Sequence, residues 1–306
     1  MIKSVTVINH LGQSLKMVLT NPDSAGFYIQ RIEGLGPVGA TVNVVERAVM
    51  DGASYNSARV GSRNIVMYLG FSLSGNIEVI RHRSYKYFPV KKRITIQIET
   101  DTRICETYGY VESNDVGVFG KGISTQISII CPDSYFYEAG SNAKNVVKFE
   151  GVDPLFEFPF SNESLGENLI EFGEIQQMVE YPIFYSGDVD VGVEIYIHAI
   201  GSASKISIYN ETTKERMVIL TERLKTILET DFEIINGDDI VITTSRGEKS
   251  ITLIRDGERY NIINCLERYP DWFQLTYGDN IFMYEAEAGG HNLQFRIEYK
   301  TAYEGV

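Results

Sequence analysis

Residues 123–137 of the chain, ISTQISIICPDSYFY, join an alternating strand pattern to an abrupt stop. Ile127 and Ile129 point to one face of the predicted strand, because side chains two residues apart share a side. Pro132 and the aspartate after it end the strand, since proline lacks the N–H that a ladder needs and aspartate favours turns. An aromatic triplet and then a small polar run, residues 138–144, follow. The stretch predicts the closing strand of a first domain, an aromatic cluster packed beneath it, and a hinge to a second domain.

The residues before this stretch predict a mainly β domain with one helix. Short alternating or apolar runs, separated by glycine, proline and Asp-Gly breaks, favour strands. These runs are residues 4–9, 15–19, 27–33, 41–49, 64–71, 94–99 and 103–112. Residues 74–88 instead place apolar side chains at helical spacing, with capping residues at the start and Pro89 after the end. We expect the first domain to span residues 1–140.

The second half of the chain carries many short strand patterns and almost no helix. The candidate strands are residues 177–185, 191–199, 205–210, 216–220, 231–236, 239–244, 250–256, 260–264, 272–275, 280–285 and 292–299. Strands of this length, separated by Gly and Asp turns, are typical of a β-sandwich or jelly roll. A single short helical piece is expected at residues 222–228. We expect a linker over residues 141–150 and a β-sandwich domain over residues 151–306.

The charge of the chain is divided unevenly between the two halves. The whole chain of 306 residues has a net charge of −13. Residues 1–140 hold 14 Lys and Arg against 12 Asp and Glu, or +2, whereas residues 141–306 hold 14 against 29, or −15. An acidic second half repels nucleic acid and anionic membranes. No stretch approaches the roughly 18 continuous apolar residues of a membrane span.

Cysteine and histidine usage argues against a disulfide framework, a metal site and most catalytic sites. The three cysteines lie far apart in the sequence, which favours small core residues in a reducing compartment. The four histidines do not pair with another ligand at metal spacing, and His198 is expected to be a packed or edge residue. The glycine-rich run at 34–39 contains a proline and precedes no helix, so a nucleotide site is not expected. We expect no catalytic residue, no cofactor and no metal.

Two surface features are candidate binding sites. Tyr269, Trp272 and Phe273 could form an aromatic platform for a sugar, although the alternative is a core cluster beneath the sheet. The predicted helix carries Arg81, Arg83 and Lys86, which could contact an acidic partner or a second subunit, or could simply form a solvated face.

An ordered set of segments resembles the distal tail (Dit) proteins of long-tailed siphophages. The segments are RHRSYKYFP at 81–89, YGYVE at 108–112, ISIICPDSYFY at 127–137, LTYGDNIFMY at 275–284, FRIEY at 295–299 and YEGV at 303–306. Ser134 stands where that family usually has a second proline. The resemblance is strongest over residues 40–137 and 270–306 and weakest over 150–265.

The resemblance implies a structural virion protein without enzymatic activity. It implies that residues 1–140 form a homohexameric ring at the end of the tail tube, and that residues 151–306 form a galectin-like domain that carries receptor-binding or baseplate proteins. The expected partners are other copies of the chain, the tail tube protein and the tail-tip hub protein. The genome would pass through the channel without specific binding, and no membrane is involved. The protein is expected in the virion, after synthesis in the host cytoplasm.

The ring also predicts where the basic helix lies. A channel that passes DNA should avoid a positive lining, because that lining would hold the polyanion back. We therefore expect Arg81, Arg83 and Lys86 at a contact between subunits and not in the channel.

Three alternatives remain open from the sequence. The first is a carbohydrate-binding module fused to an assembly domain, which needs the exposed aromatic platform. The second is a glycosidase, which needs two carboxylates that converge in a cleft; acidic pairs such as Asp188 with Asp190 lie in predicted turns instead. The third is the equivalent ring protein of a phage-derived injection machine.

Overall fold

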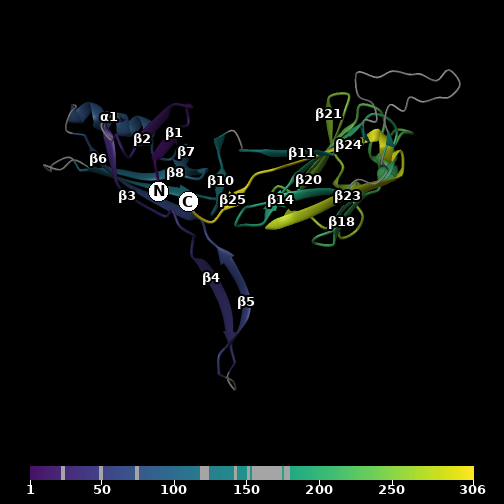
Figure 1. Cartoon of the computed structure of the whole chain (residues 1–306), viewed down its shortest axis with the longest axis horizontal. Coiled ribbons are helices and arrows are strands. Elements are labelled where there is room, and N and C mark those ends of the chain that lie inside the picture. The colour runs from purple at the N-terminus through teal and green to yellow at the C-terminus, as the bar shows by residue number, and fades with distance from the viewer. Residues whose placement is uncertain are drawn as a thin grey trace, which may run out of the picture. The chain divides into compact units, whose positions relative to one another are not determined.

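The chain divides into two compact units, each described here by itself. The structure is a computed structural model of all 306 residues. Unit 1 comprises Met1–Ala143 and Ala302–Val306, and unit 2 comprises Lys144–Thr301 (Figure 1). The described residues are 1–21, 25–47, 51–72, 76–117, 124–140, 143–149, 152–153, 174–175 and 180–306.

Unit 1 is built from antiparallel strands and one helix. Its strands are β1 (Ser4–Ile8), β2 (Ser14–Val18), β3 (Phe27–Glu33), β4 (Ala40–Glu46), β5 (Ala53–Val60), β6 (Arg63–Phe71), β7 (Arg93–Glu99), β8 (Ile104–Val116), β9 (Ser124–Cys131), β10 (Phe136–Glu138) and β25 (Ala302–Tyr303). The main sheet runs in the order β2-β1-β7-β8-β9-β6-β3, and the short strands β10 and β25 join it at β8. Among the described residues, strands β4 and β5 pair only with each other.

The alternating patterns of the first half place one set of side chains in a common core. Ile127 and Ile129 of β9 are fully buried and pack in the same core as Ile65 and Met67 of the neighbouring strand β6. The predicted strand is therefore confirmed over β9, but it lies inside the sheet, between β6 and β8, and β10 and β25 extend the sheet beyond it. Ile123 lies outside the described residues.

The helix α1 (Ile77–Tyr87) covers part of this core. The side chain of Asn76 caps it by accepting a hydrogen bond of 2.9 Å from the backbone N–H of Glu78. Ile80 and Phe88 are buried in the core of unit 1, while the helix ends just before Pro89. The predicted helix is confirmed from residue 76 onward; residues 74 and 75 lie outside the described residues.

Unit 2 contains strands β11 to β24 and several short helical elements. Its strands are β11 (Asn145–Phe149), β12 (Val152–Asp153), β13 (Glu174–Ile175), β14 (Tyr181–Tyr185), β15 (Val191–Gly192), β16 (Glu194–Ala199), β17 (Ser204–Asn210), β18 (Glu215–Ile219), β19 (Asp239–Thr243), β20 (Ser250–Arg255), β21 (Glu258–Asn261), β22 (Gln274–Leu275), β23 (Gly278–Ala288) and β24 (Leu293–Tyr299). The helical elements are η3 (Thr221–Arg223), α2 (Leu224–Ile227), η4 (Ile263–Cys265) and η5 (Gly290–Asn292).

Two antiparallel sheets of unit 2 share one core, as a β-sandwich requires. One sheet runs β11-β24-β16-β19-β20-β21, and the other runs β14-β23-β17-β18. Inward side chains of both sheets, such as Ile195 and Ile242 of the first and Ile208 and Phe282 of the second, belong to a single buried cluster. The mainly β character predicted for both halves is thus confirmed.

The ends of the units differ from the boundaries expected from sequence. Residues 145–149, placed in a linker, form the edge strand β11 of unit 2 and pair with β24. The last five residues, placed in the second domain, belong to unit 1, where Ala302 and Tyr303 pair with β10. Unit 2 is therefore inserted between β10 and β25 of unit 1.

Candidate assembly surface

Strands β4 and β5 form a hairpin, which we call the arm, that is exposed along nearly its whole length. Directly opposed residues in a hairpin share a face, so the register of β4 against β5 sorts its side chains. One face carries the pairs Ala40 with Val60, Val42 with Ala58, and Val44 with Tyr55. The exposed fractions on this apolar face are 55% for Val42, 54% for Val44 and 68% for Tyr55.

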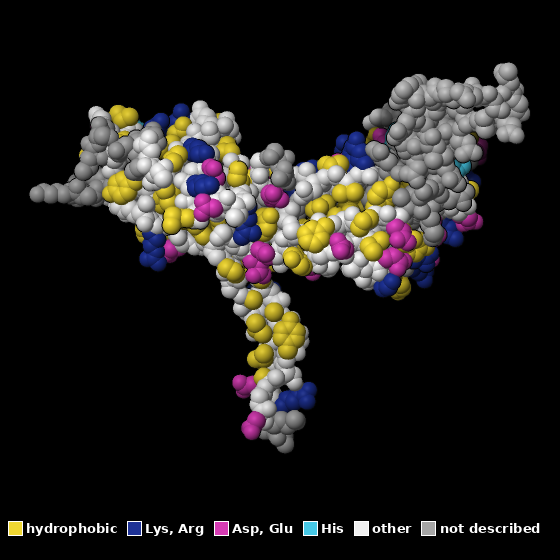
Figure 2. Space-filling view, in the orientation of Figure 1, with side chains coloured by type: hydrophobic (Ala, Val, Ile, Leu, Met, Phe, Trp, Pro, Cys, Tyr) yellow, Lys and Arg dark blue, Asp and Glu magenta, His cyan; other side chains and the backbone are white. Residues whose placement is uncertain are grey.

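The opposite face of the arm is mostly polar. Thr41 opposes Arg59 and Asn43 opposes Ser57, with a hydrogen bond of 3.0 Å from the amide of Asn43 to the hydroxyl of Ser57. Figure 2 shows apolar side chains along the arm and charged side chains gathered at its far end. A two-stranded hairpin in water is marginally stable, and contiguous exposed apolar side chains mark interaction surfaces. The arm thus has one face suited to solvent and one suited to a partner.

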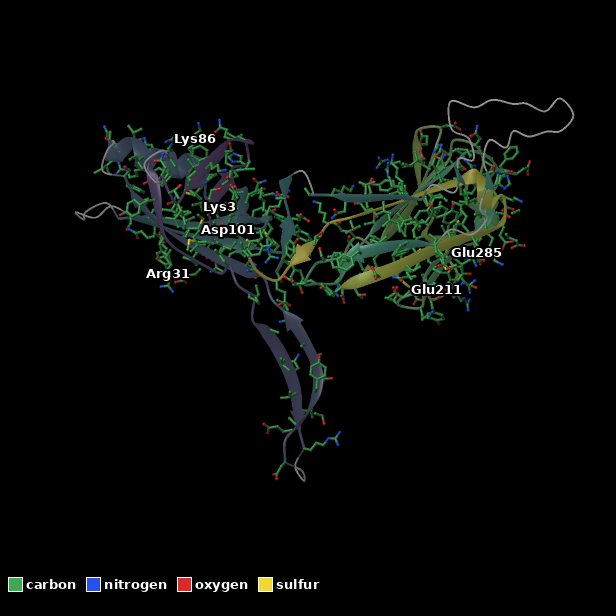
Figure 3. All side chains as sticks on the ribbon, in the orientation of Figure 1. Lys3, Arg31, Lys86, Asp101, Glu211 and Glu285 are labelled. Atoms are coloured by element: carbon green, nitrogen blue, oxygen red, sulfur yellow. The ribbon has the colours of Figure 1, made fainter. Side chains whose placement is uncertain are left out.

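The main sheet of unit 1 has two unlike edges. Among the described residues, the end strands β2 and β3 each pair with only one named strand. On β3, Arg31, which is labelled in Figure 3, forms an ion pair of 2.9 Å with Glu33, and both side chains are exposed. On β2, Lys16 lies 2.9 Å from Glu99 of β7. Open edges of this kind are templates for pairing with another chain unless charges or covers protect them.

The three basic residues of α1 have different surroundings. Arg83 donates a hydrogen bond of 2.9 Å to the backbone carbonyl of Ala25, so it supports the fold of unit 1 itself. Arg81 lies 3.4 Å from Glu78, one turn earlier on the same helix. Lys86, labelled in Figure 3, forms no ion pair with the described residues, and its ammonium lies 5.7 Å from the ring centre of Tyr87. Of the three, Lys86 is therefore the side chain that makes no ion pair and no hydrogen bond with the described residues.

The predicted aromatic platform does not form as a set of three surface residues. Phe273 is fully buried, with its ring edge-on to Phe282 at 5.5 Å between centroids, so its inclusion in the platform was wrong. Trp272 is partly buried against the core of unit 2, and the ammonium of Lys249 lies 5.4 Å from its ring centre. Tyr269 is 94% exposed. Burial alternates just before and within β22, with Phe273 and Leu275 buried and Trp272 partly exposed, so the two neighbouring aromatics separate.

In the part of the chain that the structure describes, the side chains that could catalyse a reaction or bind a metal do not cluster at one site. No group of three or more His, Cys, Asp and Glu residues there could hold a metal ion. His198 and Asp239 lie opposite each other on β16 and β19, 2.7 Å apart, and both are about half exposed. Sequence reasoning missed this cross-strand pair because 41 residues separate the partners. No described helix is long and apolar enough to cross a membrane.

Comparison with known proteins places this fold. No protein-family model and no curated protein sequence matches the chain. The crystal structure of the Dit protein of SPP1, described as a paradigm of the hub adsorption apparatus in phages that infect Gram-positive bacteria, matches with a TM-score of 0.63 and 13% identity, covering 98% of this chain and 99% of that one.

Two structures of the phage p2 baseplate in its activated conformation also match. The strontium form has a TM-score of 0.44 and 11% identity over 97% of this chain and 98% of that one. The calcium form has a TM-score of 0.45 and 12% identity over 98% and 99%. Of these three structures, the first is similar enough for its fold to be compared with that of this chain. At 13% sequence identity, the similarity shows the fold alone. The chain has the fold of a phage distal tail protein.

Proposed function

We propose that the chain is the distal tail subunit of a phage, a structural protein that forms a homohexameric ring between the tail tube and the tail-tip hub. Unit 1 closes the ring, and unit 2 carries receptor-binding or other baseplate proteins. The protein is made in the host cytoplasm and works in the virion. Its role uses no catalytic residue and no cofactor.

The observation that carries this proposal is the arm. Its apolar face, which includes Val42, Val44 and Tyr55, is exposed to solvent in a single chain. A ring of identical subunits closes when each subunit presents two different, complementary surfaces. The arm and the unlike edges β2 and β3 provide different surfaces on one unit, so a second copy of unit 1 is the occupant that suits the apolar face.

The charge distribution agrees with such an assembly. The near-neutral first half, with +2 over residues 1–140, allows copies to approach without strong repulsion. The acidic second half, with −15 over residues 141–306, suits a domain that faces solvent and partners. A tube without a strongly basic lining would let DNA pass, since phosphates bind strongly to Lys and Arg clusters.

Light scattering and negative-stain imaging of the purified chain test the proposal. We expect the mass of six subunits and six-fold rings. Replacing Val42 and Val44 by glutamate should leave a folded monomer, because charges on the apolar face prevent its burial. A wild-type chain that remains monomeric at every attainable concentration contradicts the ring.

A matched control is available on the same strand. Thr41 and Asn43 alternate with the two valines and point to the polar face. Replacing Thr41 and Asn43 by glutamate adds the same charge to the same arm but should leave the rings intact. If both double variants lose the rings equally, the apolar face is not the contact and charge on the arm is the cause.

A further inference from the structure

Arg63, the first residue of β6, is a buried arginine whose donors all bind backbone carbonyls. Arg63 is 1% exposed. Nη1 donates to the carbonyls of Gly34 (2.6 Å) and Gly36 (2.7 Å). Nε and Nη2 both donate to Ser134 (2.9 and 2.7 Å), and Nη2 also donates to Glu304 (2.6 Å). A guanidinium has five N–H groups, and all five are used.

The charge of Arg63 is stabilised without a carboxylate in direct contact. The guanidinium lies over the ring of Phe136, 4.3 Å from its centre, and Phe136 is fully buried. Burial lowers the pKa of Arg63, while the neighbouring Cys131 and Asp133 act in the opposite direction. An arginine remains protonated through such a shift, so four carbonyl groups and one aromatic face surround a buried cation.

The carbonyl groups come from the ends of two long excursions of the chain. Gly34 and Gly36 lead out of β3 into the arm, and Arg63 itself is where the chain returns from the arm (Figure 1). Ser134 precedes β10, from which the chain leaves for unit 2, and Glu304 lies just after β25, where it has returned. The side chain of Arg63 therefore binds the root of the arm, at Gly34 and Gly36, and both ends of the insertion that contains unit 2, at Ser134 and Glu304.

Further contacts tie the C-terminal residues to the root of the arm. The backbone N–H of Val306 donates to the carbonyl of Leu35 at 3.1 Å. The hydroxyl of Ser134 donates to the carbonyl of Gly61 at 2.5 Å. Gly34 has a φ of +83°, and a Cβ built there would lie 2.1 Å from the carbonyl oxygen of Asn64. The root is thus closely packed, and Gly34 accepts no larger residue without a backbone shift.

We propose that Arg63 is the positioning residue of the arm: it fixes the root of the arm and the C-terminal segment to each other and to the body of unit 1. Removing its side chain would leave four backbone carbonyls without their charged donor, and each loss favours local opening. The arm then still exists but no longer points its apolar face in one direction. The link between the arm and the C-terminal segment stands without the ring, and only the use of the arm in assembly rests on the proposed function.

Hydrogen exchange of the full-length chain tests this link without reference to assembly. In Arg63→Met we expect amides of the arm and of residues 302–306 to exchange at least about tenfold faster, because these segments lose a shared anchor. Amides of the sheet interior, such as those of Met67 and Ile129, should keep their protection. Arg63→Lys should be intermediate, since an ammonium has three donors in place of five.

Arg93→Met is the matched control, because the guanidinium of Arg93 also lies 4.3 Å from an aromatic centre, that of Tyr108, but near an exposed surface. It should leave exchange of the arm unchanged. If Arg63→Met speeds exchange throughout unit 1 equally, Arg63 is a general core residue and the proposal is overturned. Unchanged exchange at the root of the arm overturns it as well.

Deletion of residues 304–306 provides a second test that leaves the core residues in place. It removes the Glu304 carbonyl from Arg63 and the Val306 bond to Leu35. We expect faster exchange at the amides of the arm, which lies far away in sequence. If the arm does not respond to this deletion, the link between the two segments is absent. Rings that form in the wild type but fail in Arg63→Met would extend the link to assembly, whereas a wild type without rings would contradict the proposed function alone.

Discussion

Arg255 and Asp238 form a two-bonded ion pair inside unit 2. Nε of Arg255 lies 2.8 Å from Oδ1 of Asp238, and Nη2 lies 2.6 Å from Oδ2. Asp238 also accepts a hydrogen bond of 2.9 Å from the backbone N–H of Ile235, and Arg255 donates one of 2.5 Å to the carbonyl of Glu233. Asp238 is 1% exposed. The pair joins the turn before β19 to the end of β20.

Breaking this pair should destabilise unit 2 strongly. Asp238→Ala leaves the guanidinium of Arg255 nearly buried and without its anion, and removal of one partner of a buried pair typically costs about 3–5 kcal/mol. We expect a loss of that size in the free energy of unfolding. Urea unfolding followed by tryptophan fluorescence measures it for unit 2 alone, because Trp272 is the single tryptophan of the chain and lies in unit 2.

The double variant Asp238→Ala with Arg255→Met separates the energy of the ion pair from the cost of leaving one charge buried and unpaired. Replacing both ions by apolar groups removes the unpaired charge, so the loss should be smaller than for Asp238→Ala. A single variant with unchanged stability would show that water reaches the pair and that the charges are not buried in solution.

The three cysteines should resist alkylation in the folded chain. All three are buried, and burial raises the pKa of the Cys131 thiol from 9.0 to about 11. The thiolate is the reactive form, so two pKa units reduce the reactive fraction about a hundredfold at mildly alkaline pH. Iodoacetamide labelling read by mass spectrometry, with and without urea, measures the difference. Rapid labelling of Cys131 without urea would show that β9 opens readily.

The hydrophobic periodicity of the sequence predicted most strands of both units. It failed where side-chain hydrogen bonds take the place of backbone hydrogen bonds between strands. Residues 231–236 alternate like a strand, but only Ile234 forms an isolated bridge, with Ala203. The carboxylate of Asp238 accepts from the backbone N–H of Ile235, and the backbone carbonyl of Glu233 accepts from Arg255 at 2.5 Å. Local polar contacts therefore satisfy this backbone, which a pattern of apolar residues cannot reveal.

Residues 41–49 of the arm were predictable as a strand but not as an exposed surface. The sequence TVNVVERAV has the same alternation as strands of the core, so nothing in it distinguishes an exposed arm from a buried hairpin. Arg63 carried no signal either, because its partners are backbone carbonyls from segments up to 241 residues away. The two residues of β25 are too few to show a period.

The pH dependence of unit 1 should include a contribution from Glu99. Hydrogen bonds from Lys16 and Ser4, together with the charge of Lys16, hold the pKa of Glu99 below its ordinary value. A depressed pKa in the folded state adds stability above the unfolded pKa, and this stability is lost as pH falls through the folded value. Glu99→Gln should therefore lower the midpoint of thermal unfolding at neutral pH, and by less at acid pH, where the wild type loses this contribution as pH falls from the unfolded pKa through the folded one.

Circular dichroism at both pH values measures this difference. Added salt should shrink it at neutral pH, since the Lys16 ammonium is exposed and the attraction is screened. A difference between wild type and variant that persists unchanged in acid would assign the effect to packing and not to charge.

Charge reversal along α1 should distinguish residues that hold the fold from those that contact a partner. Arg83→Glu removes the hydrogen bond to the carbonyl of Ala25 and should destabilise the monomer by about 1 kcal/mol. Lys86→Glu removes no ion pair with the described residues, so the monomer should keep its stability while assembly weakens. Light scattering gives the mass and thermal unfolding of dissociated chains gives the stability. If Lys86→Glu assembles as the wild type does, this end of α1 lies outside the subunit contact, and the arm and sheet edges must form it without the helix.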